Sequence, residues 1–258
     1  MKNKTAKQIV KEYKFIFCLI IFAYVAALAF LIFIMTKNLL FGIAGVVVLG
    51  VSVRAPFDKL REKTVENVIY EELDPEKFGE ILALGMFKRS IHAKMLHLMS
   101  TGAHGEILEL IKEGDGKVKN PLDRCNNLYR EGYVYFERGE YEKLLPIYQK
   151  YESLKRENPK YVPILNNFSV FEKFDAFADD DFEYVIDVCD IDLKEINPQK
   201  QNYKLTKINV SFYRAVSLYK LGRLDEAKQG FEDIIDFAPK MYKAKLSRDF
   251  IELIDKAQ

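Results

Sequence analysis

The chain has 258 residues, of which 49% are hydrophobic and 30% are charged, and its formal net charge is +1. This balance suits a globular protein of one or two domains, but it hides a division. Residues 1–63 carry ten Lys and Arg against three acidic residues, whereas the rest of the chain carries 29 basic and 35 acidic residues. Because nucleic-acid binding normally needs a basic patch, the acidic body predicts that nucleic acid is not a partner.

The first predicted element is a membrane helix. A basic N-terminus, residues 1–14, precedes 15–35, "FIFCLIIFAYVAALAFLIFIM", which are 21 uncharged residues. At about 1.5 Å per residue this stretch is long enough to cross a bilayer core of about 30 Å. Residues 39–53, "LLFGIAGVVVLGVSV", form a second apolar stretch, which as a helix reaches only about 22 Å. We predict a short second crossing here, accommodated by local thinning of the bilayer.

Three interpretations of this region compete. A cleaved signal peptide has an apolar core of about 7 to 15 residues, which is shorter than 15–35. A single span followed by a re-entrant segment is the second interpretation. We favour the third, a hairpin of two membrane helices, because Ala23 and Ala27 on the first helix and glycines on the second, Gly42 and Gly45 among them, permit close packing.

Basic residues flank both apolar stretches and predict the orientation. Five lysines precede the first stretch and four Lys or Arg follow the second, whereas the turn between them has only Lys37. By the positive-inside rule, both termini are expected on the cytoplasmic side of the cell membrane. The bilayer, through residues 15–53, is therefore the one partner that the sequence identifies, and the localisation is that of a two-span membrane protein.

Residues 54–87 are predicted to form juxtamembrane linker helices. The stretch 57–72 has helical spacing, and Asp74-Pro75 is a typical helix start, with a capping residue followed by proline at the first helical position. We expect this helix to run to about Lys88. No run downstream alternates with a period of two, so the fold class is all-α.

Two stretches of the remaining chain, 88–258, follow one pattern. "LYREGYVYFERGEYEKLLPIYQKYESL" (128–154) and "FYRAVSLYKLGRLDEAKQGFEDIIDFAP" (212–239) superpose on Gly139 and Gly222. Seven residues before each glycine stands a small residue, Gly132 or Ala215. Two antiparallel helices joined by a tight turn need small residues at such positions, and the pattern therefore predicts helical hairpins.

The pattern resembles the tetratricopeptide repeat (TPR) family, above all in "YKLGRLDEA". Two weaker units, 92–114 and 166–191, place Gly102 and Asp180 at the turn, although Lys173 stands where a small residue is expected. Spacings between turns are 37, 41 and 42 residues, against a family period near 34. The resemblance implies an α-α solenoid of about four degenerate hairpins, and 242–258 is the expected capping helix, with Leu246, Phe250, Leu253 and Ile254 inward.

In TPR proteins the first helix of each hairpin lines a groove for a peptide or a partner helix. By register, the resemblance assigns ten residues to this groove. They are Asn126, Tyr129, Arg130, Tyr133 and Glu137 in one repeat, and Asn209, Phe212, Tyr213, Val216 and Lys220 in the later one. Exposed Tyr and Arg often anchor interfaces, but the tyrosines are equally consistent with packing between repeats.

Patterns that indicate catalysis or metal binding are weak. The three histidines, His92, His97 and His104, are five and seven residues apart, which does not place two on one helical face. The three cysteines are far apart and have no CxxC pairing, so we expect reduced thiols and neither a disulfide framework nor a zinc site. "DDD" at 179–181 is typical of a solvated turn. We expect no enzymatic activity, cofactor or metal.

The sequence therefore favours a non-catalytic, membrane-tethered adaptor or scaffold, with bacterial character in its Lys-rich, Trp-free composition. We expect this protein to bind a protein or peptide partner, which the sequence does not identify, at the cytoplasmic face of the membrane. Two alternatives stay open: a peptide-sensing signalling module, and a structural subunit of a larger membrane complex.

Overall fold

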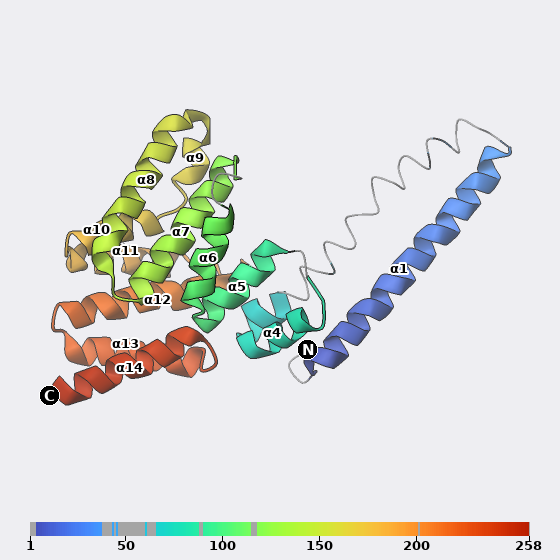
Figure 1. The fold of residues 1–258 in the computed structure, drawn as a ribbon. Helices are drawn as coiled ribbons and strands as arrows, with labels where there is room; N and C mark the ends of the chain where they lie inside the picture. The colour runs from blue at the N-terminus through green and yellow to red at the C-terminus, as the bar shows by residue number, and fades with distance from the viewer. Residues whose placement is uncertain are drawn as a thin grey trace. The chain divides into compact units, whose positions relative to one another are not determined.

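The computed structural model describes residues 4–37, 43, 45, 60, 66–87, 90–114, 118–200 and 202–257. Every regular element in these ranges is helical, which confirms the all-α prediction (Figure 1). The chain divides into two compact units, Met1–Lys94 and Met95–Gln258. The boundary lies inside helix α5 (Ile91–Thr101), a few residues after the predicted start of the repeat domain.

The first unit begins with one long helix, α1 (Ala6–Met35). A capping box starts it, because the Gln8 amide donates to Thr5 Oγ1 at 3.3 Å and the Thr5 amide donates to Gln8 Oε1 at 2.8 Å. This pair satisfies two amides that have no partner inside the helix. The predicted 15–35 is therefore helical, but the helix starts nine residues earlier than its apolar stretch.

Helix α1 has two parts with different environments. Ala6, Ile9 and Val10 are buried, and α1 packs there against α4 (Pro75–Ala83). Beyond them, large apolar side chains are exposed around the helix, with Phe15, Phe22 and other residues more than half exposed. Of the described residues, Ala6–Met35 form the one helix that is long and apolar enough to cross a membrane.

The predicted second span, 39–53, lies outside the described residues except for Ile43 and Gly45, which are both helical. A Cβ atom added to Gly45 would lie 2.4 Å from Leu31 Cδ2 of α1. A larger residue at position 45 would displace the Leu31 side chain, so glycine permits this close contact. This agrees with the role expected of the glycines, although the neighbour is Leu31 and neither of the predicted alanines.

Two short helices complete the described part of the first unit. Residues Glu66–Glu71 form a π-helix, η1, inside the predicted linker helix 57–72, of which only Leu60 and Glu72 are otherwise described. At α4, Asp74 accepts a hydrogen bond from the Lys77 amide at 3.0 Å, as predicted for a capping residue. The expected extension of α4 to Lys88 is wrong, because the chain leaves the helix after Ala83 and Gly85 takes the left-handed conformation, with φ +88°.

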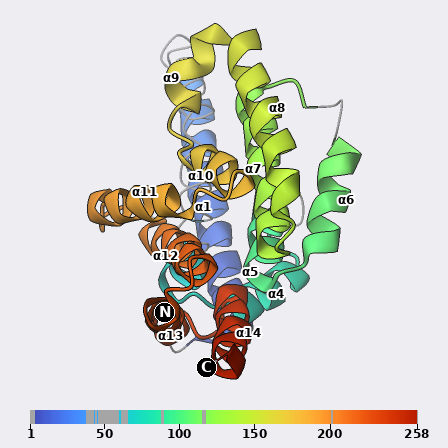
Figure 2. The ribbon, with the colours of Figure 1, turned by 90° about the vertical axis from the view of Figure 1, so that its left-hand side faces the viewer.

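The second unit consists of pairs of helices joined by short turns, which we call hairpins (Figures 1 and 2). The pairs are α5 with α6 (His104–Gly114), α7 (Pro121–Glu137) with α8 (Leu144–Glu157), α10 (Val170–Ala178) with α11 (Phe182–Glu195), and α12 (Tyr203–Lys220) with α13 (Leu224–Phe237). Helix α14 (Tyr242–Ala257) packs on α13. Shorter helices are η2 (Tyr141–Lys143), η3 (Pro159–Tyr161) and α9 (Val162–Leu165).

The four predicted turns all lie between paired helices. Gly102, Gly139 and Gly222 have φ values of +73°, +71° and +75°, and Asp180 has +57°. Glycine reaches this left-handed region without steric cost, and aspartate is one of the few other residues that tolerate it. The four positions proposed as turns from the sequence are therefore turns in the structure.

Small residues allow the hairpins to approach closely, as expected. A Cβ atom on Gly132 would lie 2.3 Å from Phe174 Cε2 of α10, and one on Gly230 would lie 3.2 Å from Ala215 Cβ. Lys173, the exception to the pattern, is buried and its Nζ atom lies 2.6 Å from Asp192 Oδ2 of α11. An ion pair therefore replaces the small residue at this crossing.

The capping helix α14 exists, but its buried face differs from the predicted one. Lys243, Ala244, Ser247 and Ile254 are buried, whereas Leu253 is 50% exposed. Phe250 is half-buried and stacks on Phe231 of α13, with ring centroids 4.9 Å apart. The face is rotated because a lysine and a serine, which the apolar pattern ignored, point toward the core.

Candidate functional site

The ten predicted groove residues lie on α7 and α12, but half of them belong to the interior. Tyr133, Glu137, Phe212, Tyr213 and Val216 are each at most 8% exposed. The prediction that these five line an open groove is wrong. Other parts of the same unit cover them, because aromatic side chains from neighbouring hairpins and the first turn of α14 pack against this face.

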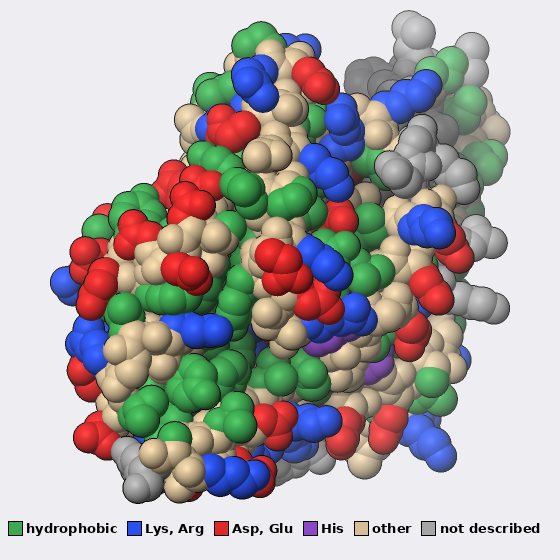
Figure 3. Space-filling model, turned by 60° about the vertical axis from the view of Figure 1, so that its left-hand side comes forward, with side chains coloured by type: hydrophobic (Ala, Val, Ile, Leu, Met, Phe, Trp, Pro, Cys, Tyr) green, Lys and Arg blue, Asp and Glu red, His purple; other side chains and the backbone are tan. Residues whose placement is uncertain are grey.

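The other five residues are accessible to different degrees. Asn126, Tyr129, Arg130 and Asn209 are half-buried and Lys220 is exposed. Arg130 Nη1 donates to Asn127 Oδ1 at 3.0 Å, and Lys220 Nζ lies 4.9 Å from the centre of the Tyr141 ring. In the space-filling view, hydrophobic side chains gather in a furrow between areas rich in charged side chains (Figure 3).

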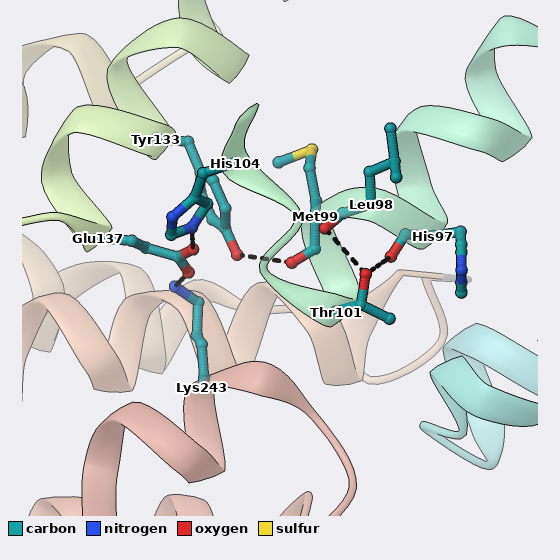
Figure 4. A network of polar contacts seen from close by, with 8 residues as sticks. All are labelled: His97, Leu98, Met99, Thr101, His104, Tyr133, Glu137 and Lys243. Carbon is teal, nitrogen blue, oxygen red and sulfur yellow. Dashed lines mark hydrogen bonds and ion pairs between the residues drawn. The ribbon is translucent and has the colours of Figure 1, made fainter. Parts of the chain in front are cut away.

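A buried carboxylate, Glu137, lies at the centre of the covered face. Its Oε1 accepts a hydrogen bond from Lys243 Nζ at 2.8 Å, and its Oε2 lies 2.7 Å from His104 Nε2 (Figure 4). Burial by itself would raise the pKa of Glu137, but the Lys243 ammonium and the hydrogen bonds from His104 and Lys243 bring that pKa below its ordinary value. The carboxylate is therefore ionised at neutral pH, inside the protein.

Lys243 reaches this carboxylate through an aromatic enclosure. Its Nζ atom lies 4.5 Å from the ring centres of both Tyr133 and Phe212, and 5.9 Å from that of Tyr213. Such distances allow cation–π attraction, which strengthens when water is excluded. Burial lowers the pKa of Lys243, and the Glu137 charge opposes this effect. We call Glu137, Tyr133, Phe212 and Tyr213 the ammonium cage.

The turn between α5 and α6 also contacts the start of α14. His104 packs edge-on against Tyr242, with ring centroids 5.3 Å apart. A Cβ atom on Gly102 would lie 2.5 Å from the Tyr242 ring, so only glycine fits beneath it. Tyr133 Oη donates to the Met99 carbonyl at 3.4 Å, which joins α5 to α7 (Figure 4). The first and last helices of the second unit are therefore joined around the cage.

Two polar groups near this junction lack hydrogen bonds. Tyr213 Oη and Ser247 Oγ are buried, and neither has a hydrogen-bond partner among the described residues. Leaving such a group unsatisfied costs about 1–3 kcal/mol. One buried hydroxyl on α12 and one on α14 therefore have no hydrogen bond among the described residues.

The sequence patterns do not predict two members of the site, His104 and Lys243. The spacing of the histidines bears only on metal binding, and the apolar pattern of 242–258 does not include Lys243. A signal did exist, because Lys243, Ser247 and Ile254 share one helical face and Glu137 interrupts the apolar face of α7. No sequence pattern pairs these two charges, which are 106 positions apart.

Other features of the described residues give weaker indications of a functional site. No group of three or more His, Cys, Asp or Glu is arranged to hold a metal ion in the part of the chain that the structure describes. Burial raises the pKa values of the Cys125 and Cys189 thiols to about 12, which disfavours the reactive thiolates. A cavity of about 600 Å³ between α6, α7 and α8 has a mixed lining that includes Ile111, Arg124 and Lys150.

The carboxylate, the ammonium and the imidazole of this site bind one another. Comparisons with known proteins find no family model, no curated protein and no solved structure that matches this chain.

Proposed function

We propose that the chain is a membrane-anchored, non-catalytic adaptor, in which TPR-like helical hairpins bind a protein or peptide partner at the cytoplasmic face of the cell membrane. The observation that carries this proposal is the combination of α1, whose apolar side chains are exposed along Phe15 to Phe33, with a second unit made of helical hairpins. Exposed apolar side chains of this kind need a lipid environment, and stacked hairpins offer an extended surface for a partner.

The proposed topology has two spans and both termini in the cytoplasm. The contact of Gly45 with Leu31 supports a second helix beside α1. The basic residues that flank the two apolar stretches support the orientation. Tethering raises the local concentration of the hairpins for any partner at the membrane, and this gain in binding needs no additional contact.

We place the partner on the accessible part of the inner face, which is formed by Asn126, Tyr129, Arg130, Asn209 and Lys220. Arg130 is half-buried, and burial lowers the pKa of its guanidinium, while Tyr129 and Asp123 oppose this effect. Burial raises the pKa of Tyr129 to about 12, and the Glu137 charge adds to the increase. Amphipathic side chains that are partly desolvated already are the type that anchors interfaces.

Photo-crosslinking in the native membrane tests the proposal. A photoreactive residue at position 130 should yield a discrete adduct with a partner protein. The same residue at position 252 on α14, where the Glu252 side chain is 68% exposed, serves as the matched control and should yield none. Absence of an adduct at position 130, or the same adducts from both positions, would refute partner binding on this face.

A further inference from the structure

The ammonium cage has the composition of a binding site for a lysine side chain. One carboxylate and three aromatic rings surround the Lys243 ammonium, and Glu137 is its one hydrogen-bond partner among the described residues. Carboxylates and π-faces together recognise ammonium groups selectively, because a neutral group gains neither the ion pair nor the cation–π attraction. The walls of the cage come from α7 and α12, whereas its occupant comes from α14.

Placing the Lys243 ammonium in the cage has a free-energy cost for α14. Burying an ion pair costs several kcal/mol in desolvation per ion, and apolar residues of similar volume often serve stability as well or better. The first turn of α14 contains Lys243 and Lys245 and no acidic residue. Positive charge at a helix N-terminus opposes the helix dipole, so this turn depends on its tertiary contacts.

Hydrogen bonding where α14 packs near the cage is also incomplete. Tyr213 Oη on the cage side and Ser247 Oγ on the α14 side are buried without hydrogen-bond partners among the described residues. If the first turn of α14 opens, both hydroxyls gain access to water or to the polar groups of another chain. The rest of α14 keeps its packing on α13, including the stacking of Phe250 on Phe231.

We propose that the cage is a recognition site for a lysine side chain of the partner protein, and that the first turn of α14 occupies it in the unbound chain. This exchange conserves charge, because the partner's ammonium replaces the Lys243 ammonium beside Glu137. The Lys243 side chain then moves into water. This inference rests on the proposed adaptor function. It adds the chemistry of the partner, a lysine on an exposed segment, and an intramolecular competitor that weakens partner binding.

Chemical rescue tests the cage in the full-length chain in lipid nanodiscs. Lys243→Ala removes three carbons and the ammonium, which n-propylammonium matches atom for atom. We expect n-propylammonium to stabilise this variant in a saturable way, by about 100-fold in the unfolding equilibrium at 100 times its Kd. The neutral 1-propanol should have no such effect, and neither should n-propylammonium on wild type or on Lys243→Ala/Glu137→Gln. Equal rescue by both compounds, or none, overturns the proposal.

Hydrogen exchange tests the opening in the wild-type chain and needs no variant to fold. We expect amides in residues 242–247 to exchange at least tenfold faster than those around Phe212 and Tyr213 in α12. Exchange of both segments at one rate would show that the turn opens only with the whole unit. That result overturns the exchange mechanism.

Crosslinking separates this inference from the adaptor function on which it rests. With the photoreactive residue at position 130, Lys243→Ala should increase the partner adduct at least threefold, and adding Glu137→Gln should remove this increase. Equal adducts in all three backgrounds leave the adaptor function standing and refute the cage as a partner site. With no adduct in any background the adaptor function fails, and so does the assignment of a partner's lysine to the cage, whatever the rescue shows.

Discussion

Glu137 and Lys243 are 106 positions apart in the sequence, and their side chains meet at 2.8 Å inside the second unit. The pair joins α7 to α14, and His104 joins the α5–α6 turn to the same carboxylate. One buried charge thus holds together helices from the beginning, the middle and the end of the hairpin array.

Removing one partner of this pair should be expensive. Lys243→Met leaves a buried carboxylate without its ammonium, and we expect the free energy of unfolding to fall by about 3–5 kcal/mol. The matched control is Lys228→Met, which removes an exposed pair with Asp255 at 2.6 Å and should cost less than about 1 kcal/mol. Urea denaturation measures the free energy of unfolding of both variants. A similar decrease in both would show that the buried pair stabilises the fold no more than the exposed pair does.

The close crossing of α7 and α10 predicts the effect of a single methyl group. Gly132→Ala places a Cβ atom 2.3 Å from Phe174, and overpacking should cost about 1–3 kcal/mol. Gly105→Ala in α6 is the control, since nothing lies within 4 Å of the added atom. Thermal unfolding should show a lower Tm for the first variant and an unchanged or higher Tm for the second. A lower Tm for Gly105→Ala than for Gly132→Ala would contradict the close packing of α7 against α10.

The later hairpin predicts a second overpacking effect. Ala227 is fully buried between α13 and its neighbours, and Ala227→Leu should destabilise the chain by about 1–3 kcal/mol. Gln229→Leu adds an apolar side chain at an exposed position of the same helix, and its effect should stay within about 0.5 kcal/mol. Circular dichroism during denaturation compares the two, and a neutral Ala227→Leu would count against the repeat register.

Buried acidic protons predict a loss of stability in alkali. Burial raises the pKa values of Cys125 and Cys189 from 9.0 to about 12, and that of Tyr151 from 10.0 to about 12. The unfolded chain therefore releases these protons at lower pH than the folded chain. Their contribution to stability is complete below about pH 9 and is lost as the pH rises toward 12, by about 1.4 kcal/mol per pH unit and group.

Urea unfolding between pH 7 and 11, with reductant present, measures this dependence. Cys189→Ala removes one of the titrating groups and should make the decline shallower, whatever its effect at pH 7. A stability that is constant up to pH 11 would contradict the burial of these groups.

Local features of the fold were predictable from the sequence, because their causes lie within a few residues. Gly139 and Gly222 mark turns since the chain there needs a left-handed residue, and Asp74-Pro75 starts a helix through its own hydrogen bond and proline geometry. The start of α1 at Ala6 depends on the Thr5–Gln8 capping box, a local signal that the apolar stretch concealed.

The composition of the site was less predictable, because its contacts join distant parts of the chain. The register placed Tyr133 and Phe212 on the inner face, but not the lysine that lies between their rings. The general expectation that charged residues face water does not predict a buried lysine at position 243. Only the folded structure shows that the Lys243 ammonium lies beside the Glu137 carboxylate of α7.

The side of the membrane on which the hairpins lie is tested most directly by thiol labelling. In a chain with Glu252→Cys and Cys18→Ser, the new thiol is on an exposed position of α14, the exposed native thiol of Cys18 is removed, and Cys125 and Cys189 are buried. The account predicts that a membrane-impermeant maleimide labels residue 252 only after the cells are permeabilised. Labelling of residue 252 in intact cells would contradict it.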